Sequence, residues 1–370
     1  MTPNDRTAVA ARVVVILLLA LTPARAVIFY STGDAAYNTT APAGSLTDSG
    51  WQFQGSWGGF LGTPIAPKYF ITAKHVGGRI GDRFSLGGVS YATIAMFDDP
   101  ETDLRIWRIC GTFPSFARLY TNNNEVGKRL VAFGRGTRRG ALIITTNLLG
   151  TIKTNGWRWS LYDGVQRWGE NEVNNIINGD GLLGDASIGE VLQATFDSPP
   201  NGGPNECHLS TGDSGGAVFI QEELIWKLAG INFAVDGPYD TTDSGGGFEA
   251  AVYDKGGLYE KSALGIWTLT PDAPFPQPGS FYSTRISARI DWINSVLDGP
   301  APPDSQPTLQ SSATVSGPFT DVAVAAIDDG ASTIRVPQPD HPEFYRLRSC
   351  QLLRIKSIRL QGGNVILQYE

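Results

Sequence analysis

The chain has 370 residues, of which 41% are apolar and 18% charged, so it is long enough for one large domain or two ordinary ones. Its 44 glycines and 23 prolines make up about 18% of the residues, against roughly 12% in average proteins. Such a density of turn-forming residues favours short strands and excludes long helical bundles. The net charge of −7, without a basic stripe, argues against nucleic-acid binding, which depends on neutralising phosphates.

Residues 1–26 have the pattern of a secretory signal peptide. Two arginines precede an apolar run over residues 13–21, and the small residues Ala24 and Ala26 mark an expected cleavage site. The run is far shorter than the ~20 residues of a membrane-spanning helix. We therefore expect a mature chain that starts at Val27, has no membrane span and is secreted or periplasmic. An uncleaved anchor or a buried N-terminal strand is the alternative.

Residues 27–297 are predicted to form one β-rich domain, because short apolar runs alternate there with Gly, Asn, Asp and Pro. These lengths and spacings favour an all-β sandwich or barrel. Strands are expected at residues 69–72, 91–96, 104–109, 129–133, 141–146, 217–220 and 224–231. One helix is expected at residues 286–297, where four aliphatic residues recur at helical spacing before a Gly-Pro pair.

Residues 298–307 are rich in proline and are predicted to be a linker. Residues 308–370 are predicted to form a small β module, with a strand at 344–347. Its hairpin joins strands at 355–360 and 365–369 through a Gly-Gly turn. The module resembles small β modules at the C-termini of many secreted bacterial enzymes, which implies a tail that binds a surface or a partner.

The strongest chemical motif is Gly-Asp-Ser-Gly-Gly at residues 212–216. Its glycines allow a tight turn around the Ser214 hydroxyl. They also leave the N–H groups of Gly212 and Ser214 free to point at a developing oxyanion. A serine hydroxyl is a weak nucleophile on its own, and it needs a base that is itself oriented by a carboxylate.

Histidine and cysteine are scarce, with three of each, so at most one disulfide bond can form. His75 follows the expected strand at 69–72, where it could serve as the base. Asp103 directly precedes the strand at 104–109, although Asp98 and Asp99 lie nearby. The other two histidines, at 208 and 341, fit structural or solvent-facing positions better.

Five segments, in the order of the family, resemble the trypsin/chymotrypsin family of serine peptidases. They are Thr-Ala-Lys-His at 72–75, Asp-Leu-Arg-Ile-Trp at 103–107, Val-Ala-Phe-Gly at 131–134, Gly-Asp-Ser-Gly-Gly at 212–216, and the strand and helix at 278–293. The resemblance covers residues 27–297. It implies an all-β fold of two six-stranded antiparallel β-barrels with a short C-terminal helix and the site between the barrels.

The resemblance implies a secreted serine endopeptidase that acts on protein or peptide substrates without a cofactor or metal. Ser214 would attack the scissile carbonyl, His75 would take and return the proton, and Asp103 would orient the imidazole. The N–H groups of Gly212 and Ser214 would form the oxyanion hole. Asp213 would pair with the new N-terminus at Val27, so that signal removal alone would activate the protein; another internal donor to Asp213 is the alternative.

The predicted substrate pocket departs from the family pattern. In the family, Asp six positions before the nucleophile selects Arg or Lys, but this chain has His208 there. Cleavage after basic residues is therefore not expected. His208 could favour an acidic or polar side chain, or have a structural role instead, so the sequence leaves the substrate preference open. Asn232 and Phe233 take the place of the family's pocket wall, and an insertion at residues 236–277 is expected to crowd the pocket. Aspartates in the insertion match no calcium loop, and a solvated acidic loop is the preferred interpretation.

Two other functions compete with the peptidase prediction. Gly212, Ser214 and Gly216 also satisfy the Gly-x-Ser-x-Gly pattern of α/β-hydrolases. That fold needs a helix after the serine and a later histidine, whereas a strand is expected at 217–220. The second alternative is a protease-fold binding or scaffold protein with little or no activity, which the long insertion and unusual pocket favour.

Overall fold

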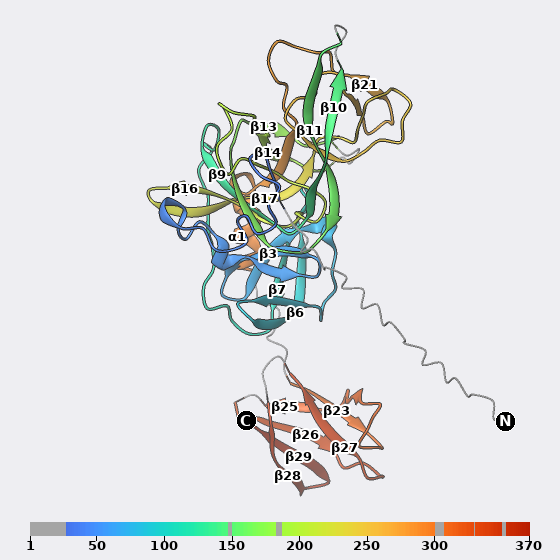
Figure 1. Cartoon of the computed structure of the whole chain (residues 1–370). Helices are drawn as coiled ribbons and strands as arrows, with labels where there is room; N and C mark the ends of the chain where they lie inside the picture. Colours follow the sequence, from blue (N-terminus) through green and yellow to red (C-terminus); the bar gives the residue numbers. More distant parts are fainter. Residues whose placement is uncertain (1–26, 147–149, 183–186, 300–306, 329, 350–352) are drawn as a thin grey trace, which may run out of the picture.

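The computed structural model describes residues 27–146, 150–182, 187–299, 307–328, 330–349 and 353–370 (Figure 1). The predicted signal peptide and most of the predicted linker at 298–307 lie outside these ranges. The described chain is all-β with one short α-helix, as the sequence predicts. None of its helices is long and apolar enough to span a bilayer.

Six strands of the first half close an antiparallel barrel in the order β2-β3-β4-β7-β6-β5. They are β2 (Gly55–Trp57), β3 (Phe60–Ala66), β4 (Tyr69–Ala73), β5 (Arg83–Leu86), β6 (Val89–Asp98) and β7 (Leu104–Ile109). Phe70, Phe84 and Trp107 fill the interior without exposed surface. The rings of Phe70 and Phe84 stack with centroids 4.1 Å apart. The three strands expected in this region are confirmed.

An eight-stranded sheet forms most of the second half. Its path is β12 (Arg167–Glu172), β9 (Arg129–Gly134), β16 (Ala217–Glu222), β17 (Ile225–Val235), β22 (Ser280–Arg285), β14 (Glu190–Thr195) and β13 (Asn175–Asn178), with β8 (Arg118–Leu119) beside β17. Within the described residues the end strands β12 and β13 do not pair with each other. The expected second closed barrel therefore stays a prediction.

Further pairings surround this sheet. They are β1 (Ile28–Phe29) with β15 (Cys207–His208); the sheet β10 (Thr137–Thr146), β11 (Ile152–Tyr162) and β19 (Ala250–Val252); and the sheet β18 (Tyr239–Asp240), β20 (Tyr259–Lys261) and β21 (Trp267–Leu269). The insertion at 236–277 is thus folded, because β19 extends the β10–β11 hairpin. Figure 1 shows β10, β11 and β21 together at one end of the molecule.

The barrel and the eight-stranded sheet share one hydrophobic core. Ile71 and Ile106 of the barrel, Phe133 and Phe219 of the sheet, and Ile293 of the helix all belong to it and are fully buried. Burial of this apolar surface holds the two halves together. Residues at the adjoining ends of β4, β7 and β17 therefore meet along a fixed junction.

The predicted helix at 286–297 is confirmed as an apolar-faced helix but starts later. α1 runs over Ile290–Leu297 and follows a 3₁₀ turn, η4 (Ser287–Arg289). Short 3₁₀ turns are common at helix N-termini. Three further 3₁₀ turns are η1 (Gly44–Leu46), η2 (Trp51–Phe53) and η3 (Lys74–Val76).

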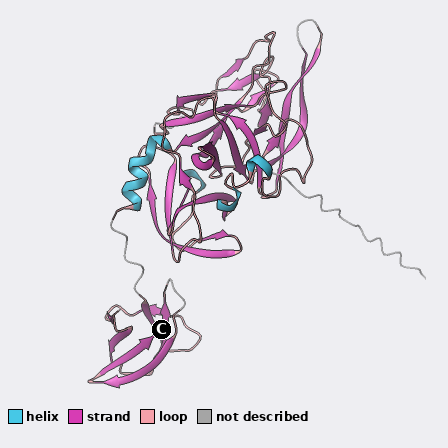
Figure 2. Ribbon diagram, turned by 90° about the vertical axis from the view of Figure 1, so that its left-hand side faces the viewer, coloured by secondary structure: helices cyan, strands magenta, loops and turns pink. Residues whose placement is uncertain are grey.

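The last strands form a body with a core of its own (Figure 2). One sheet contains β23 (Thr308–Ser312), β24 (Thr320–Asp321) and β27 (Phe344–Arg348); the other contains β25 (Ala326–Asp328), β26 (Thr333–Pro337), β28 (Ile355–Gln361) and β29 (Asn364–Tyr369). Ile334 and Leu367 at the centre of its core are fully buried. The predicted hairpin is confirmed, since Gln361 pairs with Asn364 around Gly362 and Gly363.

Candidate active site

His75 and Asp103 are brought together by the pairing of two barrel strands. The ladder between β4 and β7 ends with Ala73 opposite Leu104, so the residues that follow and precede these strands are neighbours. His75 Nδ1 lies 2.5 Å from Asp103 Oδ2, and the backbone N–H of His75 donates to Oδ1 at 2.9 Å. The carboxylate is 6% exposed, whereas the imidazole is 40% exposed. The imidazole is thus held at Nδ1 by Asp103, while part of the ring is exposed to solvent.

Neither neighbouring aspartate competes for this role. Asp99 is buried and accepts two hydrogen bonds from Arg289, each at 2.7 Å. Asp98 pairs with Arg105, and the hydrogen bond from Arg105 lowers the pKa of this carboxyl group. Of the three candidates, Asp103 is therefore the one that contacts the imidazole.

The turn that carries Ser214 depends on glycine. Gly212 has a φ of +96° and Gly215 a φ of +73°, a conformation that other residues adopt at a cost. A Cβ at Gly215 would lie 2.2 Å from Thr72 Oγ1, so the turn packs directly against β4. Within the described residues, the N–H groups of Gly212 and Ser214 donate to no other group. They are therefore available to an incoming oxygen atom.

Contacts on both sides place this turn beside His75. Gly215 packs against Thr72, three residues before the histidine, and its N–H donates to the Asn232 carbonyl at 3.1 Å. The His75 and Phe233 rings form a T-shaped pair with centroids 6.1 Å apart. Phe233 in turn lines the same cavity as Ser214. The serine, the histidine and the aspartate thus lie at the junction between the barrel and the eight-stranded sheet.

A cavity of about 260 Å³ opens beside Ser214. Phe233 lines this cavity together with Leu209 and Trp159. Asn232, which precedes Phe233 in β17, also lines it. Asn232 also fixes the turn, because its Nδ2 donates to the carbonyls of Phe133 and Asp213. The two expected wall residues, Asn232 and Phe233, are therefore both at the cavity.

His208 lies elsewhere. Its side chain is 1% exposed and its ring sits between Phe196 and Phe281. Nδ1 is 2.7 Å from the Leu209 carbonyl and Nε2 is 3.2 Å from that of Ser280, so both nitrogens face backbone carbonyl groups of the protein. Burial lowers the pKa of His208. It is not among the residues that line the cavity, and it packs in the core instead.

Asp213 is buried behind the turn. Its carboxylate accepts the N–H groups of Gly136 and Ser210, each at 2.7 Å, and the Ser210 hydroxyl at 3.0 Å. Burial raises its pKa to about 6. Val27 is also buried and lies in one hydrophobic cluster with Leu209, while the next residue pairs with residue 208. The start of the expected mature chain is thus close to this segment.

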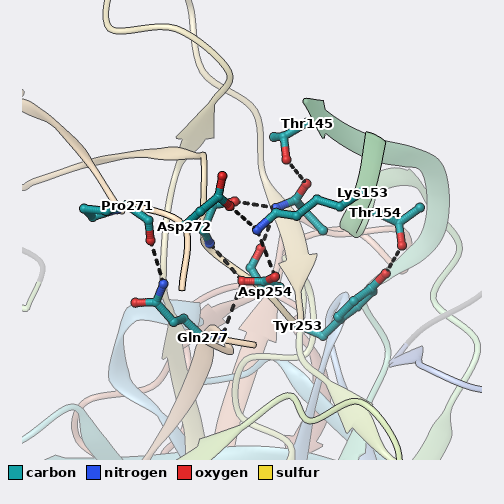
Figure 3. Close-up of polar contacts among 10 residues, drawn as sticks. Thr145, Lys153, Thr154, Tyr253, Asp254, Pro271, Asp272 and Gln277 are labelled. Carbon is teal, nitrogen blue, oxygen red and sulfur yellow. Dashed lines mark hydrogen bonds and ion pairs between the residues drawn. The ribbon is translucent and has the colours of Figure 1, made fainter. Parts of the chain in front are cut away.

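The insertion contributes a residue that sequence reasoning missed. Glu249 lines the cavity beside Ser214. The insertion is pinned to the hairpin because Lys153 binds both Asp254, at 3.0 Å, and Asp272 (Figure 3). Tyr253 bonds to Thr154 in the same cluster. Nothing in the local sequence around Glu249 marks it, because only the folding of the insertion brings it to the site.

No protein-family model matches the chain. A search of curated proteins also finds no match. The functional interpretation therefore rests on the five sequence segments and on the arrangement of the residues described above.

Proposed function

We propose that this protein is a serine endopeptidase of the trypsin/chymotrypsin type. The observation that carries the proposal is the 2.5 Å contact between His75 and Asp103, at the junction against which the Ser214 turn packs. The glycine conformations at 212 and 215 support it, because they leave two N–H groups free beside the hydroxyl.

The chemistry follows from these positions. Ser214 Oγ attacks the carbonyl carbon of the scissile peptide while Nε2 of His75 takes the hydroxyl proton. Asp103 accepts Nδ1–H and stabilises the imidazolium that forms. The N–H groups of Gly212 and Ser214 bind the oxyanion. The proton then passes to the leaving amine, and water hydrolyses the acyl-enzyme by the same steps in reverse.

The proposal extends to the fold and the location. The eight-stranded sheet would correspond to the second six-stranded barrel of the family, with β8 and β13 as additions at its sides. The protein would be secreted or periplasmic after removal of residues 1–26. The C-terminal body would bind a surface or partner, because its strand β28 presents Ile358 and Leu360 at 56% and 64% exposure.

Labelling with a fluorophosphonate probe tests the proposal. We expect Ser214 to be modified in the mature protein but not in Ser214→Ala or His75→Ala. His341→Ala, which removes an exposed histidine of the C-terminal body, serves as the matched control and should label normally. An unlabelled but folded mature protein would favour the binding or scaffold alternative, because that protein would keep the fold without a reactive serine.

A further inference from the structure

We propose that Glu249 makes the cavity beside Ser214 a specificity site for a cationic side chain, so that the protein cleaves after Lys or Arg. This inference rests on the proposed peptidase function and names its substrate class. It reverses the expectation drawn from His208, because the negative charge comes from the insertion instead of the position six residues before the nucleophile.

The cavity has the size and lining for one long side chain. Its volume of about 260 Å³ lies below the roughly 300–1,000 Å³ of pockets that enclose whole small molecules. Trp159, Phe233 and Leu209 supply apolar and aromatic surface along it. Lys and Arg carry apolar stems that pack on such surface while the charged end seeks a polar partner. An aromatic face near a cation adds further attraction.

Two carboxylates line the cavity, and only one of them is available. Both oxygens of Asp213 already accept hydrogen bonds from Gly136 and Ser210. No hydrogen bond or ion pair reaches the carboxylate of Glu249 from any described residue. Desolvation raises the pKa of Glu249, and no neighbouring charge contributes to this shift. Glu249 therefore lacks the partner that a bound cation would provide.

The backbone of Glu249 is held in place by the neighbouring sheet. The backbone carbonyl of Glu249 accepts the N–H of Trp159 at 2.9 Å. The next residue, Ala250, begins β19, which pairs with β11. Oε2 lies over the backbone of Gly237, since a Cβ at Gly237 would be 3.5 Å from it. Gly237 lines the same cavity. The fold of the insertion thus holds the backbone of Glu249 at the cavity wall, with its carboxylate near Gly237.

A charged hydrogen-bonded pair at such a site is worth about 10- to 100-fold in discrimination. We expect kcat/KM for peptides with Arg or Lys before the scissile bond to exceed that for Met by this factor. Glu249→Gln should remove most of the preference, and Glu249→Lys should shift it to Glu. Glu223→Gln makes the same chemical change in an exposed turn away from the cavity and should keep the preference. A wild type that prefers acidic or apolar residues would overturn the inference.

Binding of benzamidine, measured by calorimetry, tests the site without catalysis. We expect Glu249→Gln to weaken binding at least tenfold and Glu223→Gln to leave it unchanged. If fluorophosphonate labels Ser214 but Glu249→Gln leaves benzamidine binding unchanged, the proposed specificity site is excluded and the proposed peptidase function is kept. If Ser214 is not labelled but benzamidine binding still depends on Glu249, the peptidase function fails and the cation site stands.

Discussion

At the scale of single residues, the contacts of Asp103 favour the tautomer of His75 with the proton on Nδ1. One of its oxygens faces Nδ1 at 2.5 Å and the other accepts the backbone N–H. In Asp103→Asn, an amide group would face Nδ1 and favour the wrong tautomer, so we expect kcat/KM to fall by about 10⁴-fold. Steady-state kinetics measure the loss, and an unchanged thermal midpoint shows that the fold is kept. A loss of less than tenfold would contradict this role for Asp103.

Gly215 is the second residue on which the site depends. Gly215→Ala places a Cβ 2.2 Å from Thr72 Oγ1 and 2.6 Å from the Leu61 carbonyl. Gly127 has a similar φ of +77° but open space around a Cβ, so Gly127→Ala isolates the backbone cost of about 1 kcal/mol. We expect Gly215→Ala to cost about 1–3 kcal/mol more in urea unfolding, because of the added crowding. Equal losses in the two variants would show that the turn does not pack on β4.

At the scale of elements, a buried ion pair fixes the strand that leads into α1. Glu125 is fully buried and binds Arg285, the last residue of β22, at 2.8 and 2.9 Å. Among the described residues, Glu125→Ala leaves the guanidinium of Arg285 with Glu190 as its one remaining partner. We expect a loss of about 3–5 kcal/mol in the free energy of unfolding. Arg129→Ala, at an exposed pair, should cost less than about 1 kcal/mol.

The same pair gives a pH dependence. Burial acts to raise the pKa of Glu125, but hydrogen bonds from Arg285 and Ser287 outweigh it and lower the pKa. A carboxyl group with a lowered pKa stabilises the fold above its ordinary value of 4.5, and this stabilisation is lost as the pH falls. Wild type and Glu125→Ala should therefore converge in unfolding free energy at acid pH. A constant difference down to about pH 2 would contradict the ion pair.

The elements themselves were predictable where a local pattern decides them. The apolar runs at 69–72 and 104–109 become β4 and β7. Short apolar runs between turn residues are typical of strands whose side chains are buried, and those of β4 and β7 are almost all buried. The ladder between them then brings His75 and Asp103 together, which local patterns alone do not show. Pairings in the insertion were not predictable, since β19 joins a hairpin about a hundred residues earlier in the chain.

At the scale of the whole molecule, the candidate site combines residues from widely separated stretches of sequence. Motifs predicted His75, Asp103 and Ser214 as site residues, because the chemistry of such residues restricts the sequence around them. The sequence could not reveal Glu249, since its position depends on Lys153 and the acidic residues that pin the insertion. For His208 the sequence left a pocket role and a structural role open, and the structure shows the structural one, with two carbonyls and two aromatic rings around its buried ring.

The last prediction concerns the expected N-terminus at Val27, which lies close to the segment before Asp213. Val27 is buried and Ile28 pairs with His208, two residues before the N–H that binds Asp213. We expect the α-ammonium group of a chain that starts at Val27 to add a charged partner to Asp213, whose carboxylate already accepts the N–H groups of Gly136 and Ser210. Three extra N-terminal residues should then lower kcat/KM at least tenfold, and removing them with a site-specific protease should restore it.

Unfolding measured against pH separates this pairing from a simple steric effect of the extra residues. Burial raises the pKa of Asp213 from 3.8 to about 6. A carboxyl group whose pKa is raised in the folded state binds its proton more tightly there, so the free energy of unfolding falls as the pH rises through this window. The extended chain should show that fall. The chain that starts at Val27 should not, because its α-ammonium group stays charged below its ordinary pKa of about 8 and stabilises the carboxylate. Full activity of the extended chain, or the same pH profile for both, would exclude the pairing.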